Sequence, residues 1–227
     1  MSTLPRKTAL VLTALMLLGG CAAVSGTRPS DAASRNAGQY RSTPQDEAAF
    51  RRADSLFGQG RYRDALALYQ TLAQKGNPDA MYNTGIVYRR LGRDGEAIKW
   101  LEQAVDAGDH DAHCVLGNIQ DKISNYRTAR RHYEQAANAG LACGQTALSS
   151  YYIDGLDVRR DFRKSFDLAS SAARQNDAHG QYLLALHYLN SWSVAYNPNQ
   201  AANLLRQAAA QGHQKAREML NNGLRSR

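Results

Sequence analysis

The sequence lacks an apolar run long enough to cross a membrane. Its marked apolar stretch, Ala9 to Leu18, is about ten residues long, whereas a spanning helix needs roughly 20. The stretch follows two basic residues, Arg6 and Lys7. A short cationic head before a short apolar core is typical of a secretory signal peptide. We therefore expect residues 1–20 to be a signal peptide that is removed.

Common catalytic arrangements are also missing. No lysine follows a serine by three positions, and the sequence contains no His-Glu-x-x-His, no Gly-x-Ser-x-Gly and no phosphate-binding glycine loop. His110, His113 and Cys114 lie close together in the sequence and could ligate zinc with residues from elsewhere. The joint between two helices is the simpler explanation of this cluster. We expect a protein that is not an enzyme and that needs no metal or other cofactor.

Cysteine is scarce, with three in 227 residues. The first lies in Leu18-Gly19-Gly20-Cys21, which resembles the lipobox of bacterial lipoproteins. The resemblance implies cleavage before Cys21 and lipidation of that cysteine, with several acyl chains that anchor it stably. Because alanine and not aspartate follows the cysteine, the resemblance also implies the outer membrane, with the protein facing the periplasm.

Acidic residues are outnumbered by basic ones. Removal of residues 1–20 takes Arg6 and Lys7 from the 28 Lys+Arg and none of the 20 Asp+Glu, which leaves a net charge of +6. Nucleic acid is a poor partner for a periplasmic protein. An anionic glycan, lipid phosphates or an acidic protein face are better candidates, and a solvated basic surface is the alternative. Residues 21–45 are small and polar without apolar periodicity, which predicts a lipidated flexible tether.

The rest of the chain, residues 46–224, repeats itself. Similar segments begin at Ala49, Ala80, Ala112, Gly144 and Gly180, with a half-copy at Ala216, at intervals of 31 to 36 residues. Second segments such as R-D-A-L-A-L-Y-Q-T-L-A-Q-K-G (63–76) and R-T-A-R-R-H-Y-E-Q-A-A-N-A-G (127–140) carry small and large apolar residues at helical spacing and end at glycine. The pattern predicts an all-α fold, an α/α solenoid of about five helix pairs with a C-terminal capping helix.

This pattern resembles the Sel1-like repeats, a branch of the tetratricopeptide superfamily. The best match is L-S-S-Y-Y-I-D-G-L-D-V-R-R-D-F-R-K-S, Leu148 to Ser165. It has Ser149 and Asp157 where the family has glycine. A lipid-anchored array of this kind is similar to the scaffold lipoprotein of the alginate export apparatus, although the present array is shorter.

Once Cys21 is lipidated, Cys114 and Cys143 are left in an oxidising compartment. Both lie near the starts of first helices in adjacent units. Packed helices are 8–10 Å apart, while a disulfide needs Cα atoms closer than about 7 Å. A Cys114–Cys143 disulfide therefore remains one of two alternatives, and the disulfide-rich members of the family pair cysteines within a unit.

Three surfaces are candidates for binding. The resemblance implies a concave groove along the first helices, which carries over to Tyr82, Ile86, Arg89, Arg90, Asn118, Asp121, Lys122, Tyr182 and Leu186. The alternative is that the tyrosines only pack in the stack. A basic ridge could form from Arg127, Arg130, Arg131, Arg159, Arg160, Arg163 and Lys164. An aromatic turn carries Trp192 and Tyr196.

We expect an outer-membrane lipoprotein that acts as a protein–protein interaction scaffold. The resemblance favours a role in assembling an envelope export or secretion complex, such as one for exopolysaccharide, with envelope proteins and an outer-membrane pore as partners. The alternative is a surface-displayed binder of host or glycan ligands.

Overall fold

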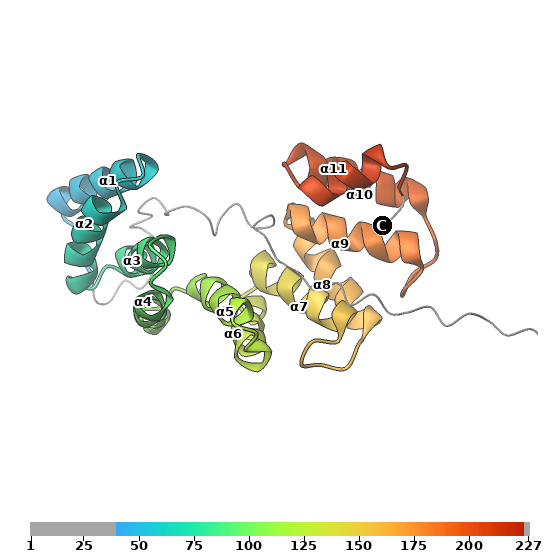
Figure 1. Ribbon diagram of the computed structural model, residues 1–227, viewed down its shortest axis with the longest axis horizontal. Helices are drawn as coiled ribbons and strands as arrows, with labels where there is room; N and C mark the ends of the chain where they lie inside the picture. The colour runs from blue at the N-terminus through green and yellow to red at the C-terminus, as the bar shows by residue number, and fades with distance from the viewer. Residues whose placement is uncertain (1–39, 225–227) are drawn as a thin grey trace, which may run out of the picture.

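The computed structural model describes residues 40–224, which form eleven α-helices (Figure 1). The lipobox-like segment and most of the predicted tether lie outside the described residues. The first helix begins at Pro44, two residues before the predicted boundary, because Thr43 caps it reciprocally with Asp46. The helices are α1 Pro44–Gly58, α2 Tyr62–Gln74, α3 Pro78–Arg90, α4 Asp94–Asp106, α5 Ala112–Lys122, α6 Tyr126–Asn138, α7 Ala142–Asp154, α8 Phe162–Arg174, α9 Ala178–Asn190, α10 Pro198–Ala210 and α11 Gln214–Asn221.

The helices form five consecutive pairs followed by α11, and each helix packs against the next along the chain. This confirms the predicted all-α array. The second helices end as predicted, with Gly76, Gly108, Gly140, Asn176 and Gly212 at positive φ. The described helices include none that is long and apolar enough to cross a membrane.

In the second and third pairs, a glycine on the first helix packs against a large side chain of the second helix. A Cβ added to Gly85 would lie 2.6 Å from Leu101 Cγ, and one added to Gly117 would meet the ring of Tyr133. In the fourth pair, Ser149 takes the glycine position and forms a 2.8 Å hydrogen bond with Ser165. The repeat is therefore maintained by complementary side-chain volume.

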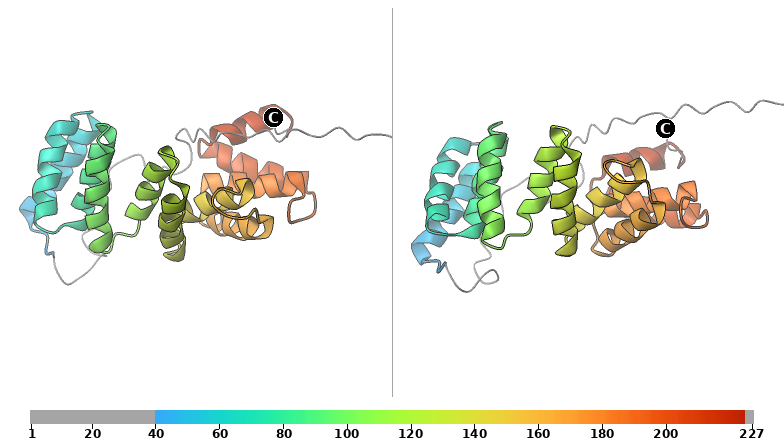
Figure 2. Two further views of the ribbon diagram at one scale, coloured as in Figure 1. Left: turned by 60° about the horizontal axis from the view of Figure 1, so that its bottom comes forward. Right: turned by 90° about the horizontal axis from the view of Figure 1, so that it is seen from below.

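Successive pairs also pack on one another through small residues. A Cβ on Gly144 would lie 2.5 Å from the backbone nitrogen of Ala137, and one on Gly180 would lie 2.6 Å from the Cβ of Ala172. The buried residues form three clusters, one spanning α1 to α5, one in α6 and α7, and one in α8 to α11. The helices of the first pairs stand steeply and those of the last pairs lie across them, so the array twists along its length (Figure 2).

The joint between α4 and α5 carries the histidine and cysteine cluster. Asp109 Oδ1 accepts the backbone amide of Asp111 at 3.0 Å, so a carboxylate orders this helix start. Cys114 forms a disulfide with Cys143, with Cα atoms 6.1 Å apart. The two cysteines lie on α5 and α7, the first helices of adjacent units, and their Cα separation is within the range that a disulfide needs.

Candidate functional site

Part of the predicted groove is buried in the array. The side chains of Tyr82 and Ile86 are only 1% and 2% exposed and belong to the cluster of α1 to α5. They cannot contact a partner, so their assignment to a binding groove is wrong. Their size and apolar character serve packing between α3 and its neighbours.

Asn118, Asp121 and Lys122 all bind side chains of neighbouring helices, Lys122 at the surface of the array. The hydroxyl of Tyr133 donates to Asn118 Oδ1 at 2.9 Å and to Asp121 Oδ2 at 2.8 Å, and the hydroxyl of Tyr151 also donates to Asp121. Burial raises the pKa of Asp121, and the two tyrosine hydrogen bonds partly offset this. Lys122 forms an ion pair with Asp94 of α4 at 2.8 Å. Asn118 therefore holds α5 against α6 within one unit, and Asp121 and Lys122 also tie neighbouring units together.

The other predicted groove residues do not gather at one site. Tyr182 stacks on His213 with ring centroids 4.6 Å apart, and Leu186 packs on the cluster of α8 to α11. Arg89 is half-buried and Arg90 is exposed, both at the end of α3. Tyr182 and Leu186 therefore serve packing, whereas Arg89 and Arg90 form a local basic surface at the end of α3.

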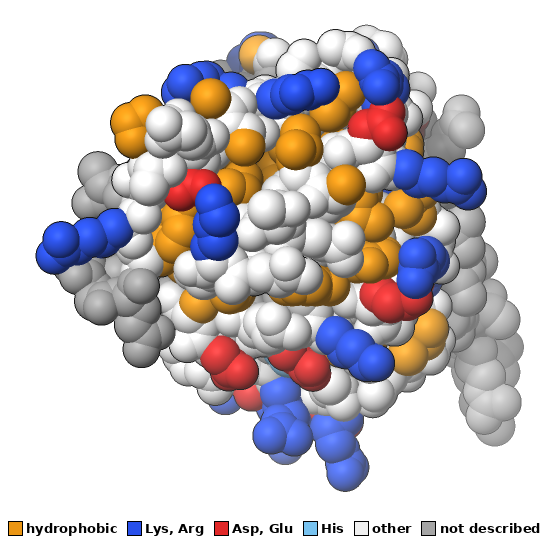
Figure 3. Space-filling model, turned by 90° about the vertical axis from the view of Figure 1, so that its left-hand side faces the viewer, with side chains coloured by type: hydrophobic (Ala, Val, Ile, Leu, Met, Phe, Trp, Pro, Cys, Tyr) orange, Lys and Arg blue, Asp and Glu red, His pale blue; other side chains and the backbone are white. Residues whose placement is uncertain are grey.

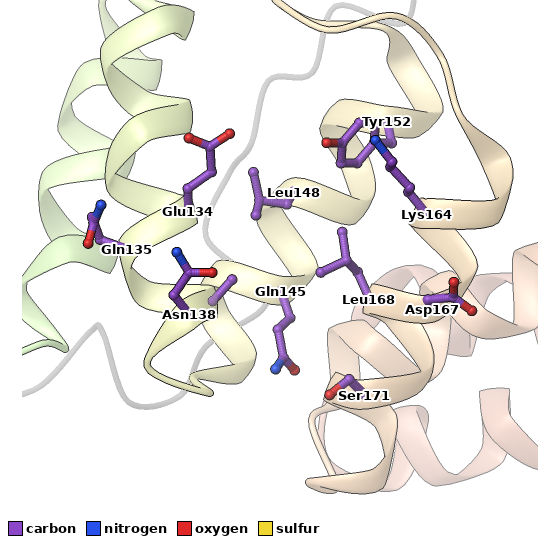
Figure 4. A pocket seen from close by; sticks show the side chains of 11 residues that line it. Glu134, Gln135, Asn138, Gln145, Leu148, Tyr152, Lys164, Asp167, Leu168 and Ser171 are labelled. Atoms are coloured by element: carbon purple, nitrogen blue, oxygen red, sulfur yellow. The ribbon is translucent and has the colours of Figure 1, made fainter.

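A cleft of about 610 Å³ opens between α6, α7 and α8. Figure 4 shows Glu134 and Asn138 on the α6 side, facing Leu148 and Leu168 across the opening. The rest of the wall combines polar and charged side chains with Ala137 and the ring of Tyr152. Its lining residues are Glu134, Gln135, Ala137, Asn138, Gln145, Leu148, Tyr152, Lys164, Asp167, Leu168 and Ser171.

The floor of the cleft is held by side-chain amides. Gln175, at the end of α8, donates through Nε2 to Gln145 Oε1 at 2.9 Å and to the carbonyl of Gly140 at 3.0 Å. The next unit repeats this arrangement, since Gln211 Nε2 donates to Gln181 Oε1 at 3.0 Å. These bonds fix α8 against the start of α7, so the cleft is a formed feature of the array.

A second hollow, of about 680 Å³, adjoins the cleft. Tyr152 and Lys164 line both, and the Lys164 ammonium lies 5.3 Å from the centroid of the Tyr152 ring. The hollow follows the turn between α7 and α8. Its lining residues are Arg130, Tyr152, Asp157, Val158, Arg159, Arg160, Asp161, Phe162 and Lys164.

The structure brings together part of the predicted basic ridge. Arg130, Arg159, Arg160 and Lys164 all line this second hollow, whereas Arg127, Arg131 and Arg163 do not. The end of the array formed by α1 and α2 differs, because its Lys and Arg side chains are spread over the surface with hydrophobic side chains between them (Figure 3).

The turn itself has a conformation that the sequence indicated. Asp157 has a φ of 51°, the left-handed region that a glycine adopts freely. It stands at the position where the resembled family has glycine. Its carboxylate accepts Arg130 Nε at 2.9 Å, and the two acidic partners Asp157 and Glu134 raise the pKa of Arg130 further.

The two residues of the predicted aromatic turn have different environments. Trp192 stacks on Phe162 with centroids 5.0 Å apart and an interplanar angle of 13°. Tyr196, in contrast, is 62% exposed. Trp192 therefore links the turns of two adjacent units, and only Tyr196 remains available to a partner.

Histidines occur in close pairs, not in metal-binding groups. His113 Nδ1 lies 3.2 Å from His132 Nδ1, and His179 Nδ1 lies 3.1 Å from His213 Nε2. Burial lowers the pKa of His113 to about 4 and that of His179 to about 3. Residues 40–224 contain no cluster of three or more His, Cys, Asp or Glu side chains that could hold a metal.

The cleft was missed because it depends on three helices of two units. Leu148 is 6% exposed and belongs to the cluster of α6 and α7, and Leu168 is half-buried against that cluster, so the sequence shows both as ordinary stripe residues. The run Arg159 to Lys164 was the one available indication of this site.

Known proteins share the repeat pattern. Residues 50–112 match the tetratricopeptide repeat family, and residues 117–141, 144–177 and 178–213 match the Sel1 repeat family. The sequence is 28% identical over 151 residues to the Sel1-repeat-containing protein YjcO of Escherichia coli, an alignment covering 63% of this chain. The chain spans 65% of the length of that relative.

Solved structures share the fold. A Sel1 repeat protein from Oxalobacter formigenes is similar with a TM-score of 0.67 at 21% identity, over 77% of this chain and 78% of that one. The immunity protein Pa5087 from Pseudomonas aeruginosa is similar with a TM-score of 0.55 at 20% identity, over 79% of this chain and 70% of that one.

These matches and the eleven-helix array define a helical repeat protein. The chain is a repeat protein of the Sel1-like and tetratricopeptide repeat superfamily. Proteins of this superfamily typically act as non-catalytic interaction scaffolds, and no catalytic family is indicated.

Proposed function

We propose that this protein is a scaffold that holds a partner protein in the cleft between α6, α7 and α8. The observation that carries the proposal is the cleft itself, with Leu148 and Leu168 surrounded by amide and charged side chains. Apolar contacts at the centre of an interface supply most of the affinity, and the polar rim orients the partner. Because side-chain amides fix the cleft walls, a partner loses little free energy in ordering them.

We further propose that the scaffold is anchored through a lipid on Cys21 in the outer membrane, facing the periplasm. There it would help to assemble an envelope export or secretion complex, such as one for exopolysaccharide. The support is the lipobox-like Leu18-Gly19-Gly20-Cys21 and the resemblance to the alginate export scaffold. Both supports come from the sequence.

The test is affinity purification of the tagged protein from crosslinked envelopes, with one cleft variant and one control. Asn138 is the last residue of α6 and lines the cleft, and Gln74 is the last residue of α2 and does not. Both are exposed. Asn138→Arg adds a longer, charged side chain at the cleft, and Gln74→Arg adds the same group at the matching position of another unit.

We expect Asn138→Arg to reduce the recovered partner at least about tenfold, because the longer side chain occupies the opening and keeps the partner from the apolar contacts at its centre, while Gln74→Arg leaves the recovery unchanged. Equal recovery from both variants would refute the cleft as the binding site. Mass spectrometry of the mature amino terminus tests the anchor. Labelling of intact cells by an added protease or antibody would favour the surface-displayed binder instead.

A further inference from the structure

The second hollow carries positive charge that no ion pair within residues 40–224 neutralises. Arg130 is engaged by Asp157 and Glu134, and Asp161 Oδ1 accepts the backbone amide of Lys164 to cap α8. In contrast, Arg159, Arg160 and Lys164 form no ion pair with any carboxylate of residues 40–224. Asp154 lies near enough for its charge to interact with Arg160 without pairing. The hollow therefore presents three cations to a ligand.

Two of these cations are positioned by aromatic rings. The Arg160 guanidinium lies 5.9 Å from the Phe162 ring, which in turn stacks on Trp192, and Lys164 lies over Tyr152. Rings beneath a cation restrict its side chain while leaving its outer hydrogen-bond donors free. The cations are thus partly ordered before a ligand arrives, which lowers the entropy cost of binding.

The turn that carries the cations is also fixed. The backbone amide of Asp161 donates to the carbonyl of Tyr152 at 3.0 Å, and that of Leu156 donates to the carbonyl of Tyr151 at 3.1 Å. Both ends of the turn are therefore tied to the last turns of α7. Because Tyr152 and Lys164 line both hollows, one extended ligand can occupy the cleft and reach the cations.

From this geometry we infer that the partner binds through an acidic segment, with carboxylates on Arg159, Arg160 and Lys164 and an apolar residue between Leu148 and Leu168. The inference rests on the proposed function and names the chemistry of its partner. A flat anionic membrane fits less well, because the cations line a hollow beside a leucine-floored cleft and not a plane. Guanidinium groups bind carboxylates through paired hydrogen bonds, which suits glutamate or aspartate side chains.

The test uses the purified protein and two fluorescein-labelled peptides, one alternating glutamate with leucine and one alternating glutamine with leucine. Binding is measured by fluorescence anisotropy over a range of salt concentrations. The variant Arg159→Gln/Arg160→Gln removes two of the cations. The matched control is Arg51→Gln/Arg52→Gln, an adjacent exposed arginine pair on α1, which changes the net charge equally.

We expect the glutamate peptide to bind more tightly than the glutamine peptide, and added salt to weaken it. Arg159→Gln/Arg160→Gln should weaken binding of the glutamate peptide about fivefold to tenfold, as the loss of two exposed charge contacts does. The affinity for the glutamine peptide should stay unchanged. The control variant Arg51→Gln/Arg52→Gln should bind both peptides as tightly as the unaltered protein does. Circular dichroism of all variants confirms that the array stays folded.

Three results would overturn the inference. The first is equal binding of the two peptides by the unaltered protein. The second is equal weakening by the two arginine pairs, which would indicate general attraction to a basic protein. The third is binding to phosphatidylglycerol vesicles that depends on Arg159 and Arg160 when peptide binding does not, which would assign the hollow to a membrane surface.

These outcomes are separate from those of the proposed function. If Asn138→Arg loses the crosslinked partner and Arg159→Gln/Arg160→Gln retains it fully, the cleft still binds a partner but not through an acidic segment. If Asn138→Arg also retains the partner, the proposed function itself fails.

Discussion

Replacing Gly144 by alanine should weaken the array at its centre. A Cβ at this position would lie 2.5 Å from the backbone nitrogen of Ala137, 2.6 Å from the carbonyl oxygen of Tyr133 and 2.7 Å from the Cβ of Ala136. Two of these three atoms belong to the α6 backbone, so a change of side-chain rotamer cannot remove the clash. Helices α6 and α7 must move apart.

The net effect follows from two opposing contributions. Overpacking a close helix contact costs about 1–3 kcal/mol, and alanine regains about 1 kcal/mol of helix propensity over glycine. We expect a net destabilisation of up to about 2 kcal/mol, or a fall in Tm of up to about 6 °C for a domain of this size. Gly95→Ala is the control, because Gly95 lies within α4 with no atom near its missing Cβ, and it should raise stability by about 0.5–1 kcal/mol.

The assay is urea unfolding followed by far-ultraviolet circular dichroism, with hydrogen exchange to locate the effect. Gly144→Ala should increase exchange first in α6 and α7, since these helices share the contact. If Gly144→Ala is as stable as Gly95→Ala, the argument that glycine permits close packing of successive units is refuted.

Three further perturbations have defined outcomes. Replacing Cys114 and Cys143 together by serine should lower the free energy of unfolding by about 3–4 kcal/mol, the loop-closure value for a separation of 29 residues. A thiol titration of the unaltered protein, denatured without reduction, should find neither of these two cysteines free. Half-buried His179 and buried His213 have folded pKa values of about 3 and 4, below the value of 6.5, so the unfolded chain binds more protons and stability falls as pH drops from about 6.5 to 4; a flat urea midpoint over this range would contradict their desolvation as neutral rings. Tyr133→Phe removes a donor to a buried carboxylate and should cost about 1–3 kcal/mol in urea unfolding.

The repeat architecture could be predicted because its determinants are local. The apolar spacing of residues 63–76 and 127–140 defines a helix face, and the terminal glycines Gly76 and Gly140 have the positive φ that their positions require. Asp157 was identified at a glycine position of the family, and the structure gives it a left-handed backbone. Each of these features depends on a few neighbouring residues.

The binding surface could not be predicted in the same way. Tyr82 and Asp121 occupy positions that a family analogy assigns to a groove, but here a tyrosine is buried and a carboxylate accepts the hydroxyls of Tyr133 and Tyr151. Which face remains open depends on the angle between successive units. Side-chain volumes on α6, α7 and α8 together set that angle, and no single segment contains this information.

Photocrosslinking from the cleft in intact cells tests the scaffold proposal most directly. A benzophenone amino acid would replace Asn138 in one strain and Gln74 in another, at matching ends of α6 and α2. We predict that illumination links one partner protein to the Asn138 position and none to the Gln74 position. Equal crosslinking from the two positions, or none from Asn138 while the tagged protein still co-purifies with its partner, would contradict the account.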